Sequence, residues 1–336
     1  HAKSYMNTSD AVKLSLKINQ KGGFDCPGCA WPDPDDERSS LGEYCENGMK
    51  AIAEEAQNKT IGVDFFKQYS VDQLSELSDF ELGKSGRLSM PMYLQPGATH
   101  YKPISWHEAF NKVAKHLNAL QSPDEAVFYT SGRTTNEAAF LYQLFVRAYG
   151  TANLPDCSNM CHEASGKALT ETLGIGKGSV TLDDLYKADL VMVIGQNPAT
   201  NHPRMLTALE KTKKNGGKII AVNPLPEAGL IKFTNPQRPL KILTGGTTLA
   251  DVFVPVTING DVAFIKAILL KLLEKEEAQG GVFDKAFIDS HTSGYNAFIA
   301  NLKTFDFDTC LKLSGVSLPV FNEAFHLILN NKKIIV

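Results

Sequence analysis

Short runs of hydrophobic residues alternate with longer stretches of helical periodicity over residues 157–330 of the chain. Leu190–Ile194 is apolar at every position, and the similar runs Lys218–Val222 and Phe253–Val256 follow it. Helical segments separate these runs, and a further helix is predicted over Asp261–Lys275. Strands that are hydrophobic on both faces are typical of a parallel sheet with helices on each side. Residues 157–330 are therefore predicted to form one doubly wound α/β domain.

The N-terminal residues 1–104 are rich in loops and show little periodicity. One helix is predicted over Tyr44–Ala56, whereas Trp31–Ser40 is acidic, contains prolines and is predicted to be irregular. Because few apolar positions are available to build a core, we expect a small domain that is held together partly by something other than hydrophobic packing.

Residues 105–156 are predicted to form a β-α unit. Ser105–Glu108 has the sequence of a capping box, which opens a helix. Ala126–Thr130 is a short run typical of a β-strand, and the capped helix that follows it can end at Gly150.

Length and composition exclude several classes of protein. The chain has 336 residues, 43% hydrophobic and 21% charged, and this ordinary globular mixture excludes a disordered or low-complexity protein. A net charge of -3 provides no basic surface for nucleic acid, and the apolar runs are too short to span a membrane. No signal-peptide pattern argues for export, so a cytoplasmic location is expected. The chain starts without Met and ends within a predicted strand, which indicates a piece of a longer protein.

Three cysteines near the N-terminus form the first candidate site. Cys26 and Cys29 make a C-x-x-C pair, which suits one tetrahedral metal or two corners of an iron–sulfur cube, and Cys45 follows them. Half of a zinc site, a redox pair and two buried thiols are the alternatives. Since four ligands are usual, Asp33 is the nearest oxygen ligand that would complete the set.

Cys157 and Cys161 form the second candidate site, and His162 follows directly. Cys161 precedes a helix predicted to begin near Glu163, so its thiolate would feel the positive end of the helix dipole. His162 could shuttle a proton there. A disulfide or a structural thiol pair is the alternative interpretation. Cys310 stands alone and is predicted to be a small buried side chain.

Polar residues follow three consecutive predicted strands. In an open α/β sheet, ligands bind beside the carboxyl ends of the strands, where loops meet helix N-termini. Three such strand ends are typical of a nucleotide site, although ordinary loop capping explains each of them singly. A separate glycine-spaced loop lacks the spacing of a phosphate-binding motif, but its glycines would let the backbone approach a bulky ligand. The residues concerned are Gly195, Asn197, Thr200, Asn201 and His202 after the first strand, Asn223 after the second, Asn259, Gly260 and Asp261 after the third, and Gly174 and Gly176 in the glycine loop.

Three stretches of sequence, CPGCAWPDP, DCSNMCH and VIGQNPATNHPR, resemble the molybdopterin oxidoreductase family, and the resemblance covers nearly the whole chain. The branch that it resembles is the formate dehydrogenase-like "oxidoreductase alpha (molybdopterin) subunit". The resemblance implies the fold of a formate dehydrogenase/DMSO reductase-like large subunit. Its domains would be an N-terminal iron–sulfur domain at 1–104, the first half of a split α/β domain at 105–156, a molybdopterin guanine dinucleotide-binding domain at 157–330, and the start of the return into the split domain at 331–336.

The resemblance also implies ligands for an N-terminal 4Fe-4S cluster. Cys26, Cys29 and Cys45 match the first, second and fourth cluster cysteines, and Asp33 stands where the family has the third. Asn47 replaces the lysine that formate dehydrogenases place two residues after the last cluster cysteine. A cluster with one oxygen ligand, a three-iron cluster and no cluster are all open readings of these departures.

A Mo-bis(molybdopterin guanine dinucleotide) cofactor is implied as well. Cys161 matches the cysteine or selenocysteine that ligates molybdenum, and His162 matches the neighbouring histidine that handles protons. The implied activity is two-electron oxidation of formate or a similar small substrate, with electrons leaving through the cluster to an electron-transfer partner. A non-catalytic cofactor-binding or scaffold relative is the alternative. Contacts with the pterin or the guanine dinucleotide are implied for Gly174, Gly176, Gly195, Asn197, Thr200, Asn201, Asn223, Gly260 and Asp261.

Overall fold

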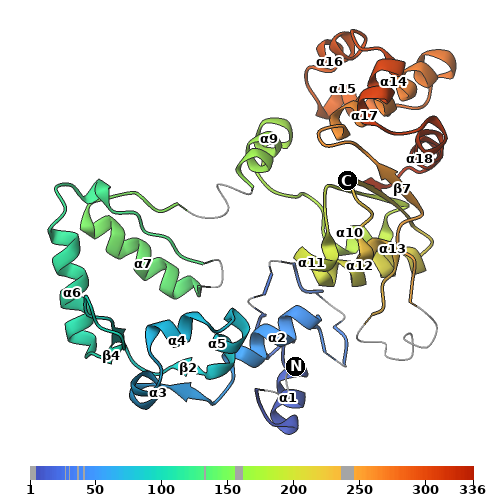
Figure 1. Ribbon diagram of the computed structural model, residues 1–336. Helices are drawn as coiled ribbons and strands as arrows, with labels where there is room; N and C mark the ends of the chain where they lie inside the picture. The colour runs from blue at the N-terminus through green and yellow to red at the C-terminus, as the bar shows by residue number, and fades with distance from the viewer. Residues whose placement is uncertain are drawn as a thin grey trace. The chain divides into compact units, whose positions relative to one another are not determined.

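The chain forms two compact units, which are visible in Figure 1. The first unit comprises His1–Gly28 and Gly42–Ser179, and the second comprises Cys29–Leu41 and Val180–Val336. The computed structural model describes residues 5–26, 28–29, 31–35, 38–40, 42–131, 134–155, 162–235 and 246–336.

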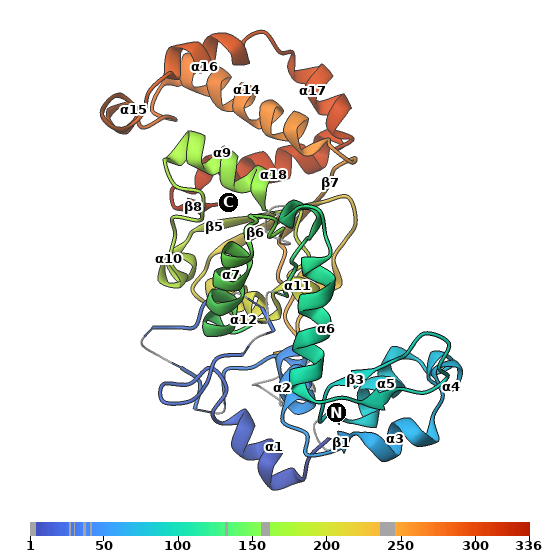
Figure 2. The same cartoon turned by 90° about the vertical axis from the view of Figure 1, so that its left-hand side faces the viewer.

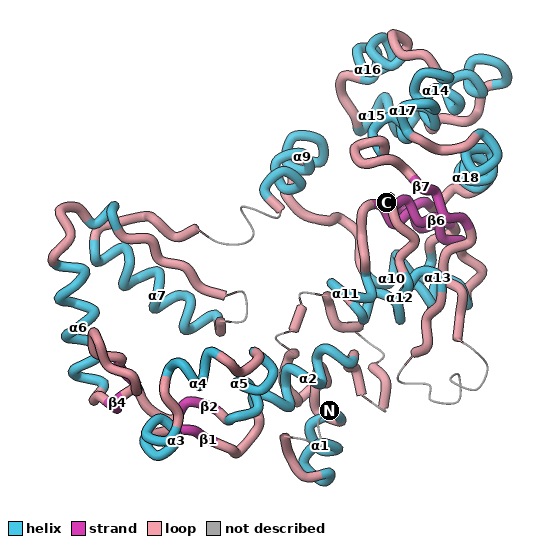
Figure 3. The backbone as a smooth tube through the Cα atoms, viewed as in Figure 1, coloured by secondary structure: helices cyan, strands magenta, loops and turns pink. Residues whose placement is uncertain are grey.

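Among the described residues, the second unit is built on a parallel sheet of four strands in the order β7-β6-β5-β8. Figure 3 draws strands in magenta and labels β6 and β7 of this sheet. Val191 of β5 lies beside Ile219 of β6, and Val222 of β6 lies beside Val254 of β7. The predicted parallel sheet is thereby confirmed, and β7 begins one residue earlier than the sequence predicts. The strands are β5 (Leu190–Ile194), β6 (Lys218–Asn223), β7 (Val252–Pro255) and β8 (Ile334–Ile335).

Strand β8 corrects one expectation of the sequence. Residues 331–336 are predicted to begin a return into a different domain. The structure instead pairs Ile334 with Leu190 and Ile335 with Val191, so β8 extends the sheet of the second unit. Two isoleucines predict a strand, but they carry no information about which strand they join, because that choice depends on long-range packing.

Helices cover both faces of this sheet, as predicted for a doubly wound fold. Alternate residues of β5 point to opposite faces: Leu190 packs in a core with Phe264 and Phe321, whereas Val191 packs in a second core with Leu209. Helix α14 packs against α17, and α18 packs against β7 (Figure 2). The helices are α10 (Leu182–Lys187), α11 (Pro198–Asn201), α12 (Pro203–Lys214), α13 (Ala228–Ile231), α14 (Asp261–Gln279), α15 (Lys285–His291), α16 (Tyr295–Leu302), α17 (Phe307–Ser314) and α18 (Leu318–Asn330).

The first unit consists of short helices and small strand pairs. Strands β1 and β2 pair in parallel, and β3 and β4 pair antiparallel. The predicted capping box at Ser105 is present, and Gly150 ends α7 in the left-handed conformation with φ 110°. The elements are α1 (Thr8–Ser15), α2 (Glu46–Glu55), β1 (Thr60–Ile61), α3 (Val63–Gln68), α4 (Val71–Ser75), α5 (Asp79–Ser85), β2 (Arg87–Leu88), β3 (Met92–Tyr93), β4 (Lys102–Pro103), α6 (Trp106–Asn118), α7 (Asn136–Tyr149) and α9 (Glu163–Leu173).

The strand predicted over Ala126–Thr130 is absent from the first unit, where these residues form an extended loop. Phe128 donates its backbone N–H to the carbonyl of Asn153 at 2.9 Å. A strand needs a ladder of such pairs with a neighbour, and the described residues supply no second strand beside this run.

Helices α6 and α7 expose large apolar side chains. Val146 is fully buried in a small core with Phe128, but six other large apolar side chains of these two helices are more than half exposed. Isolated apolar side chains are common at protein surfaces, whereas an apolar group of this size marks a surface that contacts another chain segment or molecule. The group consists of Trp106, Phe110, Val113, Phe140, Leu141 and Leu144, which are 55–65% exposed.

The two compact units divide the chain at points other than the expected domain boundaries, and those boundaries stay a prediction. Residues 29–41 were assigned by their sequence to the N-terminal domain, yet they belong to the second unit, because Trp31 packs against the core that includes Leu206 and Leu209. Residues 162–179 were assigned to the α/β domain, yet they belong to the first unit. Helix α9 within them buries none of its side chains.

Candidate functional site

Cys26 and Cys45 form a pair of thiols in the first unit. Cys45 is the N-cap of α2, where its Sγ accepts the N–H of Gly48 at 3.3 Å. Cys26 Sγ accepts the N–H of Gly28 at 3.3 Å. A Cβ atom placed on Gly48 would lie 2.9 Å from Cys26 Sγ and 3.7 Å from Cys45 Sγ. Both sulfurs therefore border the same small space, and only glycine at position 48 leaves it open.

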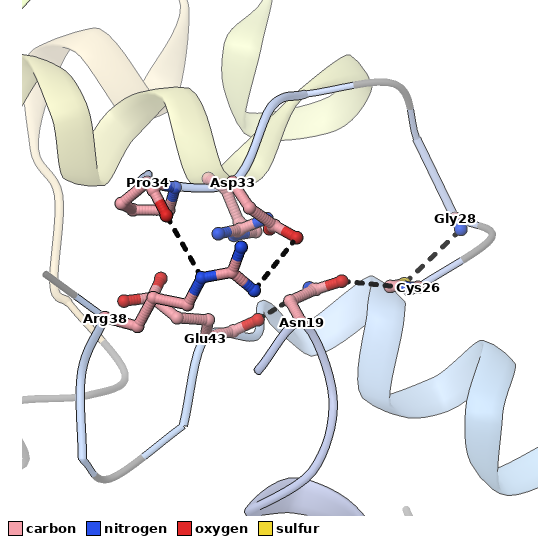
Figure 4. Close-up of polar contacts among 8 residues, drawn as sticks. Asn19, Cys26, Gly28, Asp33, Pro34, Arg38 and Glu43 are labelled. Atoms are coloured by element: carbon pink, nitrogen blue, oxygen red, sulfur yellow. Dashed lines mark hydrogen bonds and ion pairs between the residues drawn. The ribbon is translucent and has the colours of Figure 1, made fainter. Parts of the chain in front are cut away.

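A buried asparagine, Asn19, connects the two segments that carry these thiols (Figure 4). Its Oδ1 accepts the N–H of Cys26 at 2.7 Å, and its Nδ2 donates to the carbonyl of Glu43 at 2.7 Å. The backbone of Asn19 has φ 54°, a left-handed conformation that asparagine tolerates better than most residues. The sequence analysis did not identify Asn19, since its partners lie in two separate loops.

Cys29 and Asp33, the other predicted cluster ligands, belong to the second unit. Asp33 Oδ1 accepts a hydrogen bond from Arg204 Nη1, and Asp33 Oδ2 lies 3.6 Å from Arg38 Nη1. Within the described ranges, no group of three or more His, Cys, Asp or Glu side chains is arranged to hold a metal ion. The ligand set of Cys26, Cys29, Cys45 and Asp33 therefore stays a prediction.

The predicted nucleotide residues after β5 and β6 lie at the carboxyl ends of these parallel strands. Gly195 is exposed with φ 67°, and Asn197 caps α11 by accepting the N–H of Thr200 at 3.3 Å. The side chains of Thr200 and Asn201 are exposed. Asn223 is buried at the end of β6, and its Nδ2 donates to the carbonyl of Gln196 at 3.0 Å, which ties the two strand ends together.

Gly260 and Asp261 follow β7, which is the neighbour of β6 in the sheet. A Cβ atom on Gly260 would lie 2.5 Å from Thr257 Oγ1 and 2.8 Å from the carbonyl of Ser314. Packing alone therefore requires glycine at this position. Asp261 is half-buried in the first turn of α14, where a carboxylate is favourable to the helix dipole.

His162 lies just before α9 and borders an open hollow of about 500 Å³ in the first unit. Its predicted partner Cys161 lies outside the described residues, as does Cys157. The predicted pterin residues have local structural causes: Gly174 ends α9 with φ 80°, and a Cβ atom on Gly176 would lie 2.9 Å from Thr170 Oγ1. The hollow is lined by His162, Glu163, Gly166, Lys167, Thr170, Glu171 and Gly176.

Cys310 is buried in the core on the α14 side of the sheet, which confirms its predicted structural character. Burial raises the pKa of its thiol, because a charged thiolate is disfavoured away from water.

Comparison with known proteins gives consistent relationships. Residues 87–236 match the family model of the molybdopterin oxidoreductases. The chain is 50% identical to an uncharacterized oxidoreductase of Mycobacterium bovis, over 95% of this chain and 41% of that protein. It is 44% identical to the protein YdeP of Escherichia coli, over 93% of this chain and 42% of that protein.

A more distant relative is formate dehydrogenase H of Escherichia coli, which is 28% identical over 89% of this chain and 38% of that protein. The chain thus spans about two fifths of the length of the curated relatives it matches. Acetylene hydratase from Pelobacter acetylenicus is similar in structure, with a TM-score of 0.54 and 16% identity over 71% of this chain and 30% of that chain. This likeness supports the fold alone.

Within the part of the chain that the structure describes, no helix has both the length and the hydrophobicity required to cross a lipid bilayer.

Proposed function

Because the chain belongs to the molybdopterin oxidoreductase family, we propose that the full-length protein is a molybdenum-dependent oxidoreductase resembling formate dehydrogenase. Its substrate would be formate or a similar small molecule, oxidised by two electrons. The observation that carries this proposal is the gathering of Gly195, Asn197, Thr200 and Asn223 at the carboxyl ends of adjacent parallel strands, where α/β sheets bind nucleotides.

The residues at these strand ends fit a bound dinucleotide. Exposed side chains of Thr200 and Asn201 leave polar groups available, and the capped loop that holds them is fixed by the hydrogen bond from Asn223 to Gln196. They would hold the guanine dinucleotide of the cofactor. The molybdenum centre, when bound, supplies the redox chemistry. Cys161 would ligate the metal and His162 would accept the substrate proton.

The thiol pair fits an iron–sulfur ligand set in part. Cys26 and Cys45 border one space, and each sulfur accepts a backbone N–H. With Cys29 they would hold the N-terminal cluster that passes electrons to a partner. Asp33 fits poorly, since its carboxylate is paired with arginine side chains.

The exposed apolar group on α6 and α7 supports the split-domain interpretation of residues 105–156. In the full-length protein, a later segment would cover these side chains. The curated relatives are long enough to contain such a segment, because the chain spans 41% of the Mycobacterium bovis protein.

A non-catalytic relative that has lost the normal cluster is the second candidate, and the replacement of a cluster cysteine by Asp33 favours it. The full-length protein, expressed and purified without oxygen, tests both candidates: visible absorption of an iron–sulfur cluster favours the enzyme, and its absence favours the non-catalytic relative. The proposed enzyme retains molybdenum and releases a pterin guanine nucleotide that mass spectrometry identifies, and Cys161→Ala reduces the retained molybdenum. Cys310→Ala is the matched cysteine control and leaves molybdenum unchanged. Wild-type protein that retains neither molybdenum nor pterin contradicts the proposal.

A further inference from the structure

Asp33 lies between two arginines of the second unit (Figure 4). Arg204 Nη1 donates to Asp33 Oδ1, and Arg38 Nη1 lies 3.6 Å from Asp33 Oδ2. Arg38 also donates through Nε to the carbonyl of Pro34 at 3.0 Å. The side chains are mostly buried, with 18% of Asp33 and 9% of Arg204 exposed.

The two guanidinium groups argue against iron at this carboxylate. Each oxygen of Asp33 faces a positive charge, and those charges would repel an iron ion placed on either oxygen. An iron ligand at Asp33 would also leave Arg204 as a buried charge without this partner, which is costly.

The contact instead attaches one short stretch of chain to the loop after β5. The acidic segment, residues 31–35 and 38–40, carries Trp31, which packs against the core that includes Leu206 and Leu209. The ring of Trp31 lies 6.3 Å from the ring of His202, the last residue of that loop. Arg204 follows two residues later in the first turn of α12. The contact of Trp31 with His202 and the ion pair of Asp33 with Arg204 thus hold the acidic segment against the end of this loop.

We propose that Asp33 is a positioning residue that, through Arg204, fixes the loop Gly195–His202, and that it is not an iron ligand. That this loop contacts the cofactor rests on the proposed function, whereas the ion pair does not. Any iron–sulfur group would then take its protein ligands from Cys26, Cys29 and Cys45.

The experiment uses the full-length protein carrying Trp106→Phe. Trp31 is the other tryptophan of the 336-residue sequence, and the same protein with Trp31→Phe supplies the spectrum that is subtracted, so the difference reports on the acidic segment. Three changes are compared: Asp33→Asn, the charge swap Asp33→Arg with Arg204→Asp, and Asp35→Asn as a matched control at an exposed aspartate of the same segment. Acrylamide quenching of Trp31 is measured before iron is added, and iron per protein is measured after anaerobic reconstitution.

The proposal expects Asp33→Asn to shift Trp31 emission to the red and to increase its quenching, the charge swap to reverse both changes, and Asp35→Asn to change neither. It also expects all three variants to bind as much iron as the wild type. Loss of iron in Asp33→Asn that the swap does not restore, with Trp31 unchanged, overturns the proposal and makes Asp33 a ligand. A wild type that binds no iron or molybdenum contradicts the proposed function, while the quenching of Trp31 in the variants still shows whether Asp33 is a positioning residue.

Discussion

Glu210 on α12 forms hydrogen bonds with Asn235 and Thr247, and its removal provides a quantitative test of the packing in the second unit. The Glu210 side chain is buried, with 1% of the residue exposed. Its Oε2 accepts from Lys214 Nζ at 2.9 Å and Asn235 Nδ2 at 3.1 Å, and its Oε1 accepts from Thr247 Oγ1 at 3.1 Å. Thr247 also exchanges two backbone hydrogen bonds with Phe233, at 2.8 and 2.7 Å.

The expected cost follows from which donors lose their acceptor. Glu210→Met leaves the buried amide of Asn235 without this carboxylate, at about 1–3 kcal/mol for a buried donor. Thr247 is half-buried and adds a smaller amount, while Lys214 is exposed enough to regain water. The total destabilisation is about 2–4 kcal/mol. Glu210→Gln keeps one oxygen for Asn235 and can donate to Thr247, so losing the charge costs about 1 kcal/mol.

Urea unfolding measures these differences when it is followed by the emission difference between the Trp106→Phe background and the same background with Trp31→Phe, because Trp31 lies in the same unit as Glu210. With an m-value of roughly 2 kcal/mol/M, Glu210→Met lowers the unfolding midpoint by about 1–2 M. Glu277→Gln is the control, since the Glu277–Lys303 ion pair is more than half exposed and contributes about 0.5 kcal/mol or less. A midpoint for Glu210→Met no lower than that of Glu277→Gln would refute the reasoning.

Three further predictions concern other parts of the chain. Hydrogen bonds from Lys285 and two backbone N–H groups lower the pKa of Glu276 from 4.5 to about 2, so its contribution to stability is complete above pH 4.5 and is lost as the pH falls toward 2. The stability difference between wild type and Glu276→Gln, measured by urea unfolding, should shrink over that pH range. A difference that stays constant contradicts the prediction. Phe264→Ala removes a fully buried ring and should cost about 3–5 kcal/mol by the same assay, against about 1 kcal/mol or less for the exposed Phe298→Ala. Gly48→Ala places a Cβ atom 2.9 Å from Cys26 Sγ and should reduce iron bound on anaerobic reconstitution, whereas Gly83→Ala, in open space on α5, should not; equal iron in both variants would contradict the shared space at the thiol pair.

The part of the fold that the sequence predicted rests on local signals. The uninterrupted apolar run at Leu190–Ile194 predicts a buried parallel strand, because both of its faces must be covered. Ser105 and Gly150 predict the ends of their helices, because a side-chain cap and a left-handed glycine act within a few residues of themselves. Ala126–Thr130 shows the limit of such signals: its residues suit a strand, but the structure describes no partner strand for them.

Some features of the candidate site could likewise be predicted from the sequence, and others could not. The spacing of Cys26, Cys29 and Cys45 and the polar residues after the strands could be identified in the sequence, since chemistry-bearing residue types at fixed spacing are themselves the signal. The role of Asn19 could not, because it is defined by hydrogen bonds to two other loops. The glycine at 260 has a packing cause that involves Ser314, far along the chain.

The sequence by itself determined the α/β class and the strands of the central sheet, and it showed the likeness to the family, because hydrophobic periodicity, caps and motif spacing are properties of short stretches. Only the tertiary structure decided that β8 joins β5 and that Asp33 pairs with Arg204, 171 residues away. A carboxylate at position 33 can bind a metal ion or pair with a guanidinium group, and the sequence alone does not distinguish the two. Which partner it meets depends on how the chain folds back, since a hydrogen-bonded ion pair requires its two groups to lie within a few ångströms of each other.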